Sequence, residues 1–199
     1  MRKVTLKELE IIASICREDI YAKARSAGRD PKIYLHWSAG FYNTLFDDYH
    51  INITGDGEIY LSTDDLSQTL PHTWHRNTGA IGITICACYN ATPEDLGAGG
   101  CPPTKKQIEV MAQVVAYLSK ALWLTIDKNH VLTHGEAADN LDNLNEDADY
   151  GALTTCERWD LHYLGTDESP AFVYDYNDPS TGGNVLRGKA NWYANHIRE

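Results

Sequence analysis

Residues 80–86 constrain the fold more than any other stretch, because they read Ala-Ile-Gly-Ile-Thr-Ile-Cys and carry no charged side chain. A strand with this continuous apolar character has no face suited to water. The sequence therefore predicts a central strand that is covered on both faces.

Three segments have the apolar periodicity of amphipathic helices. They cover residues 6–26, 105–122 and 185–197. Capping boxes precede the first two helices, at Thr5 with Glu8 and at Thr104 with Gln107. In the third helix, Trp192 is the expected anchor.

Short strands alternate with these helices. They are expected at residues 32–37, 49–54, 58–62, 80–86 and 131–133. The second and third flank the turn Gly55-Asp56-Gly57 and should form a hairpin. Long connections occupy residues 63–78 and 136–155, and loops of such length in a compact domain are often functional. The chain contains no repeat, linker or low-complexity tract, so residues 1–199 are expected to form a single domain.

The formal net charge of -11 argues against general nucleic-acid binding, which requires a concentrated Lys/Arg surface to neutralise phosphates. No apolar run approaches the length that crosses a bilayer, so membrane insertion is not expected. Residues 1–5 lead into a charged helix rather than into the apolar core of a signal peptide. We therefore expect synthesis in the cytoplasm as a soluble protein.

The five cysteines form an odd set without the spacing of a disulfide scaffold, which favours a reducing compartment. Cys86 and Cys88 face the same side of a strand and are a conceivable metal-binding pair. Burial in the core is the better interpretation, because free cysteine is among the most buried residue types.

Candidate metal ligands stand at three points where strands or loops end. His36 ends an apolar run, His134 follows the strand at 131–133, and Asp160 lies in a later loop. A strand-end histidine is more often structural than functional. However, two neutral imidazoles and one carboxylate are a common catalytic zinc set, which leaves a fourth position for water and lowers the pKa of that water to about 7.

Five motifs follow one another in the chain: Leu35-His36-Trp37-Ser38-Ala39, Asp48-Tyr49-His50-Ile51-Asn52-Ile53 with the turn at 55–57, Thr73-Trp74-His75 through Ile81-Gly82-Ile83, Thr133-His134-Gly135-Glu136-Ala137-Ala138, and Arg158-Trp159-Asp160-Leu161. This ordered set resembles the zinc-dependent N-acetylmuramoyl-L-alanine amidases of the type 2 class, relatives of peptidoglycan recognition proteins. Residues 186–193 are similar to endings of phage-associated members, the endolysins. The resemblance covers residues 32–195 and implies a single α/β domain, with a mixed central β-sheet flanked by α-helices.

The resemblance also implies roles for individual residues. The implied zinc ligands are His36, His134 and Asp160. Family members assist the metal with a tyrosine at the position of Tyr49 or a glutamate at the position of Thr84, so Tyr49 is expected to orient or deprotonate the attacking water here. Arg158 takes the place of a lysine that stabilises the oxyanion, and a guanidinium differs in geometry from an ammonium group.

The third ligand has an alternative, because some relatives use a cysteine and Cys156 lies shortly before Asp160. The pattern around Arg158 favours the aspartate. His162 is expected behind the ligands or at the surface. Glu136 is either a solvated loop acid or a group that hydrogen-bonds to the site.

Four residues are expected to contact the substrate: Trp37, His75, Asn77 and Glu136. Trp74 is expected to pack beneath this groove, and His72 to be an ordinary loop histidine. His50 should face away from Tyr49 as a core or edge residue. His130 and His196 are expected at the surface.

The implied reaction is hydrolysis of the amide between N-acetylmuramic acid and L-alanine, in peptidoglycan or in muropeptides, by a monomer. A non-catalytic peptidoglycan-binding module is the main alternative. A secreted antibacterial toxin would keep the same chemistry, and an unrelated metallohydrolase of small amides or peptides is a third possibility. Without a signal peptide, phage lysis or secretion would bring the enzyme to the periplasmic cell wall, whereas wall recycling would keep it in the cytosol.

Overall fold

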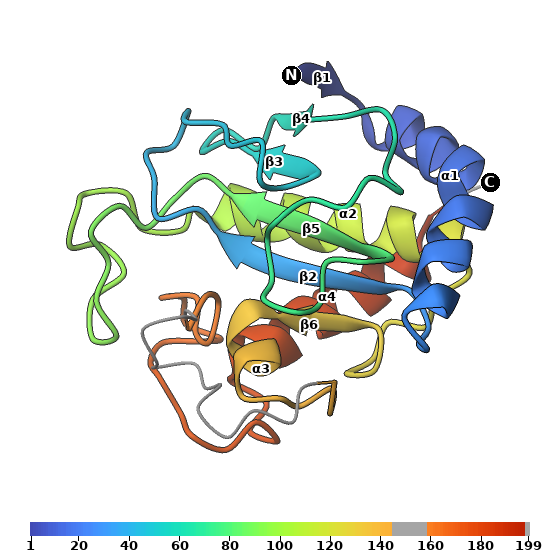
Figure 1. Cartoon of the computed structure of the whole chain (residues 1–199). Coiled ribbons are helices and arrows are strands. Elements are labelled where there is room, and N and C mark those ends of the chain that lie inside the picture. The colour runs from blue at the N-terminus through green and yellow to red at the C-terminus, as the bar shows by residue number, and fades with distance from the viewer. Residues whose placement is uncertain (145–158, 198–199) are drawn as a thin grey trace.

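The computed structural model describes residues 1–144 and 159–197 and arranges them around one mixed sheet (Figure 1). In chain order the elements are β1 (Arg2–Val4), α1 (Leu6–Ser26), β2 (Lys32–Trp37), β3 (Ile51–Ile53), β4 (Ile59–Leu61), β5 (Ala80–Ile85), α2 (Lys105–Leu122), β6 (Val131–Thr133), α3 (His134–Ala138) and α4 (Gly182–Ala194). Across the sheet the strands follow the order β1-β4-β3-β5-β2-β6.

β5 lies within the sheet, as predicted. It pairs in parallel with β2 on one side and with β3 on the other, and all its residues are buried. The predicted hairpin is present as the antiparallel pair β3 and β4. β1 pairs with β4 and was not predicted, because it is a three-residue edge strand with two exposed residues. The fold is therefore the predicted mixed α/β architecture.

The two faces of β5 are covered by different kinds of structure. α2 packs against β5 and β3 and also contacts α1 and α4, and in Figure 1 α2 and α4 lie behind the strands. Residues 62–79, which connect β4 to β5, cross in front of β5 and β2 in the same view. A side-chain carbon at Gly82 of β5 would stand 2.5 Å from the ring of His72 in this connection. A loop, rather than a second layer of helices, thus covers the front face.

The starts of α1 and α2 agree with the sequence prediction, because both predicted capping boxes are present. α4 begins at Gly182, three residues before the predicted start, with Thr181 as its N-cap. The expectation that Trp192 anchors this helix is wrong, because its side chain is 57% exposed. α4 is held instead by the buried side chains of Leu186, Arg187 and Ala190.

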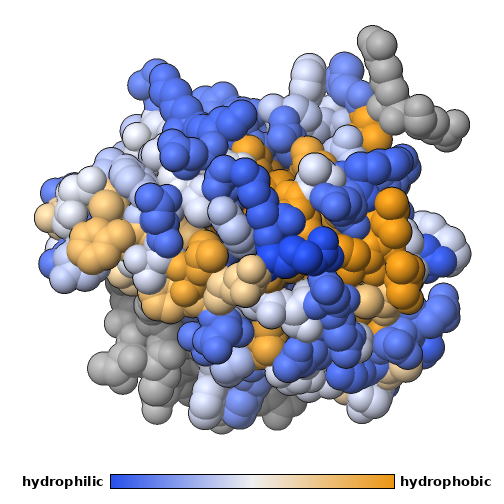
Figure 2. All heavy atoms as spheres, turned by 90° about the horizontal axis from the view of Figure 1, so that it is seen from above, coloured by the Kyte–Doolittle hydropathy of each residue, from blue (hydrophilic) through white to orange (hydrophobic). Residues whose placement is uncertain are grey.

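Two isoleucines of α1, Ile11 and Ile15, are exposed. α1 lies at the end of the sheet opposite to the tips of β2 and β5 in Figure 1, and Figure 2 shows hydrophobic residues gathered at the surface over this side. This apolar surface is therefore remote from His36, which stands near the end of β2. Among the described residues, no helix combines the length and the apolar character needed to cross a bilayer.

Candidate metal centre

Parallel strands bring the two histidines of the site to one edge of the sheet. His36 is the second-last residue of β2, and His134 directly follows β6 as the first residue of α3. β6 runs parallel to β2, and Thr133 lies opposite Leu35. The residues that follow these two, His134 and His36, are therefore brought side by side. Thr133 caps α3 through a capping box with Glu136, which fixes the turn that aims His134.

Asp160 reaches the two histidines from a turn within the connection between α3 and α4. Its carbonyl oxygen accepts a hydrogen bond from the backbone N–H of Gly135 at 3.3 Å, which ties this turn to α3. Leu161, the next residue, has a left-handed backbone with φ of 58°. Gly182 lets α4 approach this turn, because a side-chain carbon there would lie 1.9 Å from the Leu161 carbonyl oxygen.

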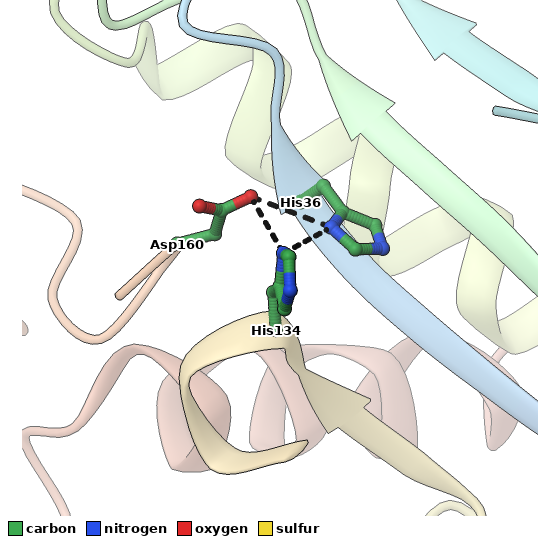
Figure 3. Close-up of side chains that lie close together, drawn as sticks. All are labelled: His36, His134 and Asp160. Atoms are coloured by element: carbon green, nitrogen blue, oxygen red, sulfur yellow. Dashed lines mark hydrogen bonds and ion pairs between the residues drawn. The ribbon is translucent and has the colours of Figure 1, made fainter. Parts of the chain in front are cut away.

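Three side-chain atoms converge in the site (Figure 3). The Nδ1 atoms of His36 and His134 lie 3.1 Å apart, and Oδ2 of Asp160 lies 3.3 Å from each. A tetrahedral zinc ion with bonds of about 2.0–2.2 Å would hold its ligand atoms about 3.3 Å apart. The spacing of the three atoms therefore fits one zinc ion, and all three side chains are buried.

The chemistry of the three groups fits a metal as well as their spacing does. Two neutral imidazoles and one carboxylate each offer a lone pair to a common point, and one anion leaves a bound Zn²⁺ with residual positive charge. Among the described residues, this is the only cluster of histidine, cysteine, aspartate or glutamate side chains with metal-binding spacing.

Comparison with protein families agrees with this geometry. A family model described as N-acetylmuramoyl-L-alanine amidase, Amidase_2, matches residues 16–152. The chain belongs to this family. Searches of curated proteins and of solved structures gave no significant match. His36 and His134 lie within the matched residues, whereas Asp160 lies beyond them. The structure places the aspartate beside the two histidines.

Aromatic and polar side chains surround His36 on the sheet. The ring of Tyr49 lies 5.0 Å from the ring of His36 between centroids, and Tyr49 is 5% exposed. Thr84 stands opposite His36 on β5, and its hydroxyl donates to the carbonyl of Ile85 at 3.2 Å. Thr73 reaches the far side of the imidazole, with its Oγ1 3.2 Å from Nε2. Thr73 belongs to the motif Thr73-Trp74-His75, but no sequence pattern predicted its contact with His36.

The loop before β5 differs from its predicted arrangement. Trp74 does not pack beneath the loop but is 54% exposed and stacks on the exposed His75. Asn77 organises the loop, because its Oδ1 accepts hydrogen bonds from the backbone N–H groups of His72 and Thr73 at 3.2 and 2.8 Å. His72 is not an ordinary loop histidine: it is buried against the sheet, and burial holds its pKa well below the usual value of 6.5.

Trp37 is 3% exposed and belongs to the hydrophobic core. Its ring meets that of Trp159 edge-on at a centroid distance of 5.3 Å. Because Trp159 directly precedes Asp160, this contact helps to hold the third candidate ligand. The position of Trp37 thus supports a packing role rather than contact with substrate.

Glu136 is not a solvated loop acid, because it is 1% exposed. Its two carboxylate oxygens accept hydrogen bonds from the guanidinium of Arg187, each at 2.7 Å. One of these oxygens also accepts the backbone N–H of Thr133 at 2.9 Å. These contacts support a structural role that joins α4 to the start of α3. The capping spacing of Thr133 and Glu136 was a signal in the sequence, whereas nothing local pointed to Arg187.

A second buried ion pair holds the loop before β5. Arg76 is fully buried and donates to Asp142 through Nη2 and Nε at 2.7 and 2.8 Å. The hydroxyl of Tyr34 in β2 also donates to Asp142 at 2.8 Å. Burial opposes ionisation of Asp142, but the hydrogen bonds and charge of Arg76 outweigh it and hold the pKa below its usual value. The pair therefore links this loop to β2 and to the segment after α3.

Other histidines occupy structural positions. His50 is a core residue, one of the two predicted places: Nε2 donates to the Gln68 carbonyl at 2.7 Å and Nδ1 accepts from Gly82 N–H at 3.1 Å. His162 is buried rather than at the surface and donates to the Val173 carbonyl at 2.6 Å. His130 is half-buried beside Asp127, and His196 is exposed as predicted.

The predicted cysteine pair lies in the core. Cys86 and Cys88 are fully buried, and burial raises the pKa of Cys86 to about 12. Such thiols are poor metal ligands and poor nucleophiles. Arg158 and the alternative ligand Cys156 lie outside the described residues.

Proposed function

We propose that this amidase hydrolyses the amide between N-acetylmuramic acid and L-alanine of peptidoglycan, with the help of a zinc ion. The convergence of His36, His134 and Asp160 in a chain of this family carries the proposal. Bound by these three groups, zinc would supply a Lewis acid that polarises the scissile carbonyl and lowers the pKa of water.

Tyr49 is the residue proposed to handle the attacking water. Its ring packs against His36, which places it beside the ligand set rather than on the outer surface. A phenol hydroxyl at this place can orient a water molecule or take its proton, as general-base catalysis requires. Arg158, whose place in the chain is close to Asp160, is proposed to stabilise the oxyanion by its positive charge.

The proposed substrate side is the loop that carries Trp74 and His75. The two rings stack at a centroid distance of 4.5 Å and are both exposed, next to Thr73, which contacts His36. Exposed aromatic rings beside buried ligands suit a substrate with sugar and peptide surfaces. His75 and Asn77 thus remain the proposed groove residues, with Asn77 holding the loop in shape.

The observations favour an enzyme over a non-catalytic binding module, because all three ligand positions are filled and their atoms converge. For delivery we propose an endolysin-like route, in which a monomer made in the cytoplasm reaches the periplasmic wall by lysis. Secretion as a toxin or a role in muropeptide recycling would use the same chemistry. A neighbouring immunity gene would indicate the toxin, and a holin gene the lysis enzyme.

Digestion of purified sacculi tests the proposal. The wild type and His134→Ala are incubated with sacculi, with and without a chelator, and the products are analysed by mass spectrometry. We expect glycan strands freed of peptide with the wild type, and no release with the variant or with chelator. Cleavage within the glycan or the stem peptide would refute the reaction, and full activity in chelator would refute the metal.

A further inference from the structure

Thr73 contacts the far nitrogen of a candidate zinc ligand. Nδ1 of His36 faces His134 and Asp160, whereas Nε2 points away from them and lies 3.2 Å from Oγ1 of Thr73. The same hydroxyl lies 2.9 Å from Nδ1 of His72. One hydroxyl therefore stands between two buried imidazoles, and Thr73 is itself 1% exposed.

Metal binding by Nδ1 of His36 would give both hydrogen bonds a direction. A neutral imidazole that offers the lone pair of Nδ1 to a metal carries its proton on Nε2. Nε2–H of His36 then donates to Oγ1 of Thr73. The hydroxyl proton of Thr73 can then be donated to Nδ1 of His72, which leaves the proton of His72 on Nε2.

We propose that Thr73 is a positioning residue that holds His36 in its metal-binding tautomer and orientation, through a hydroxyl shared with His72. This inference rests on the proposed zinc function. Removal of a group that hydrogen-bonds to a metal-binding histidine typically lowers metal affinity by about 10- to 100-fold.

The surrounding structure holds Thr73 and His72 in place for this role. The backbone N–H of Thr73 donates to Oδ1 of Asn77 at 2.8 Å, and its carbonyl accepts from the N–H of Arg76 at 3.0 Å. The ring of His72 fits against β5 because Gly82 has no side chain there. The contact with β5 thus keeps the ring of His72 from moving toward the sheet and away from Thr73.

Zinc affinity of the apoprotein tests the inference without any amidase assay. Zinc is titrated into the wild type, Thr73→Val and Thr73→Ser in competition with a chromophoric chelator. We expect Thr73→Val to bind zinc about 10- to 100-fold more weakly and Thr73→Ser, which keeps the hydroxyl, to bind within about threefold of the wild type. Thr54→Val is the matched control, because Thr54 is also buried but its hydroxyl accepts a turn N–H from Glu58.

Nitrogen NMR of the histidine rings provides a readout that simple loosening of the fold would not produce. We expect His36 and His72 each to carry the proton on Nε2 in the zinc-loaded wild type and in Thr73→Ser. In Thr73→Val, His72 should lose its fixed tautomer while the thermal unfolding temperature falls no further than in Thr54→Val. Equal zinc affinity of Thr73→Val and wild type, or equal weakening by valine and serine, would overturn the inference alone. A wild type that binds no zinc would overturn the proposed function as well.

Discussion

The Nδ1 atoms of His36 and His134 lie 3.1 Å apart, although 98 residues separate the two in the chain. Leu35 and Thr133, the residues directly before them, are paired between the parallel strands β2 and β6. The proximity of the two histidines therefore results from strand pairing rather than from a flexible loop. Ligands carried by rigid elements keep their geometry when no metal is bound. The two histidines are therefore expected to be preformed in the apoprotein.

Tyr49→Phe tests the residue assigned to the attacking water. Removing only the hydroxyl should lower kcat by about 10²–10⁴-fold, the usual contribution of a general base, and leave zinc affinity unchanged. Kinetics on solubilised peptidoglycan and zinc competition titrations measure the two quantities. Unchanged kcat would remove Tyr49 from the reaction.

Asp160→Asn tests the identity of the third ligand. The substitution keeps the shape of the side chain but removes the anion. Zinc affinity should therefore fall by more than about 100-fold, the upper end of the loss when a group that only hydrogen-bonds to a ligand is removed. Cys156→Ser is the control and should bind zinc like the wild type. The opposite pattern, with the cysteine variant impaired and the asparagine variant intact, would assign the third ligand to Cys156.

The ion pair between Glu136 and Arg187 predicts a stability effect. Arg187→Met leaves a carboxylate buried without its partner and should reduce the free energy of unfolding by about 3–5 kcal/mol. In Glu136→Gln/Arg187→Met no charge is left buried, so part of the loss should be recovered. Urea unfolding of both proteins measures this difference. A double variant at least as unstable as Arg187→Met would show that the carboxylate is not the cause.

Much of the fold could be predicted from local patterns. Apolar continuity identified β5, and the capping boxes at Thr5 and Thr104 fixed the starts of α1 and α2. The histidines of the site could be recognised because each stands at the end of a short apolar strand. Such signals lie within a few neighbouring residues, where helix and strand periodicity act.

Partners that are distant in sequence could not be predicted in this way. Arg187 meets Glu136 across 51 residues, and no local pattern connects the two. Thr73 and His72 gain their roles only when residues 62–79 fold over Gly82. Trp192 is not the anchor of α4, because the side of the helix that faces the core carries Leu186 and Ala190.

His50 predicts a loss of stability in acid. Burial lowers the pKa of His50 from 6.5 to about 4, so between these values the unfolded chain binds a proton that the folded chain does not. Stability should therefore fall as the pH drops from about 6.5 toward 4, with a contribution of about 3 kcal/mol at the acid end.

Denaturant unfolding of the wild type and His50→Gln in chelator, at several pH values, measures the contribution of His50. Glutamine retains a donor and an acceptor, so the variant should lose less stability than the wild type between neutral and acid pH. His196→Gln, which replaces an exposed ring, is the control. Parallel pH profiles of wild type and His50→Gln would contradict the prediction.

The most direct test of the central claim is to digest a muropeptide in water enriched in the heavy isotope of oxygen and to locate the label by mass spectrometry. Hydrolysis of the amide between N-acetylmuramic acid and L-alanine adds one labelled oxygen to the carboxylate of the muramic acid lactyl group, and it frees the amino group of L-alanine. We predict the label at that carboxylate and none in the peptide. Label in a peptide carboxylate or at a sugar carbon would show that the chain cleaves a different bond, and would contradict the account.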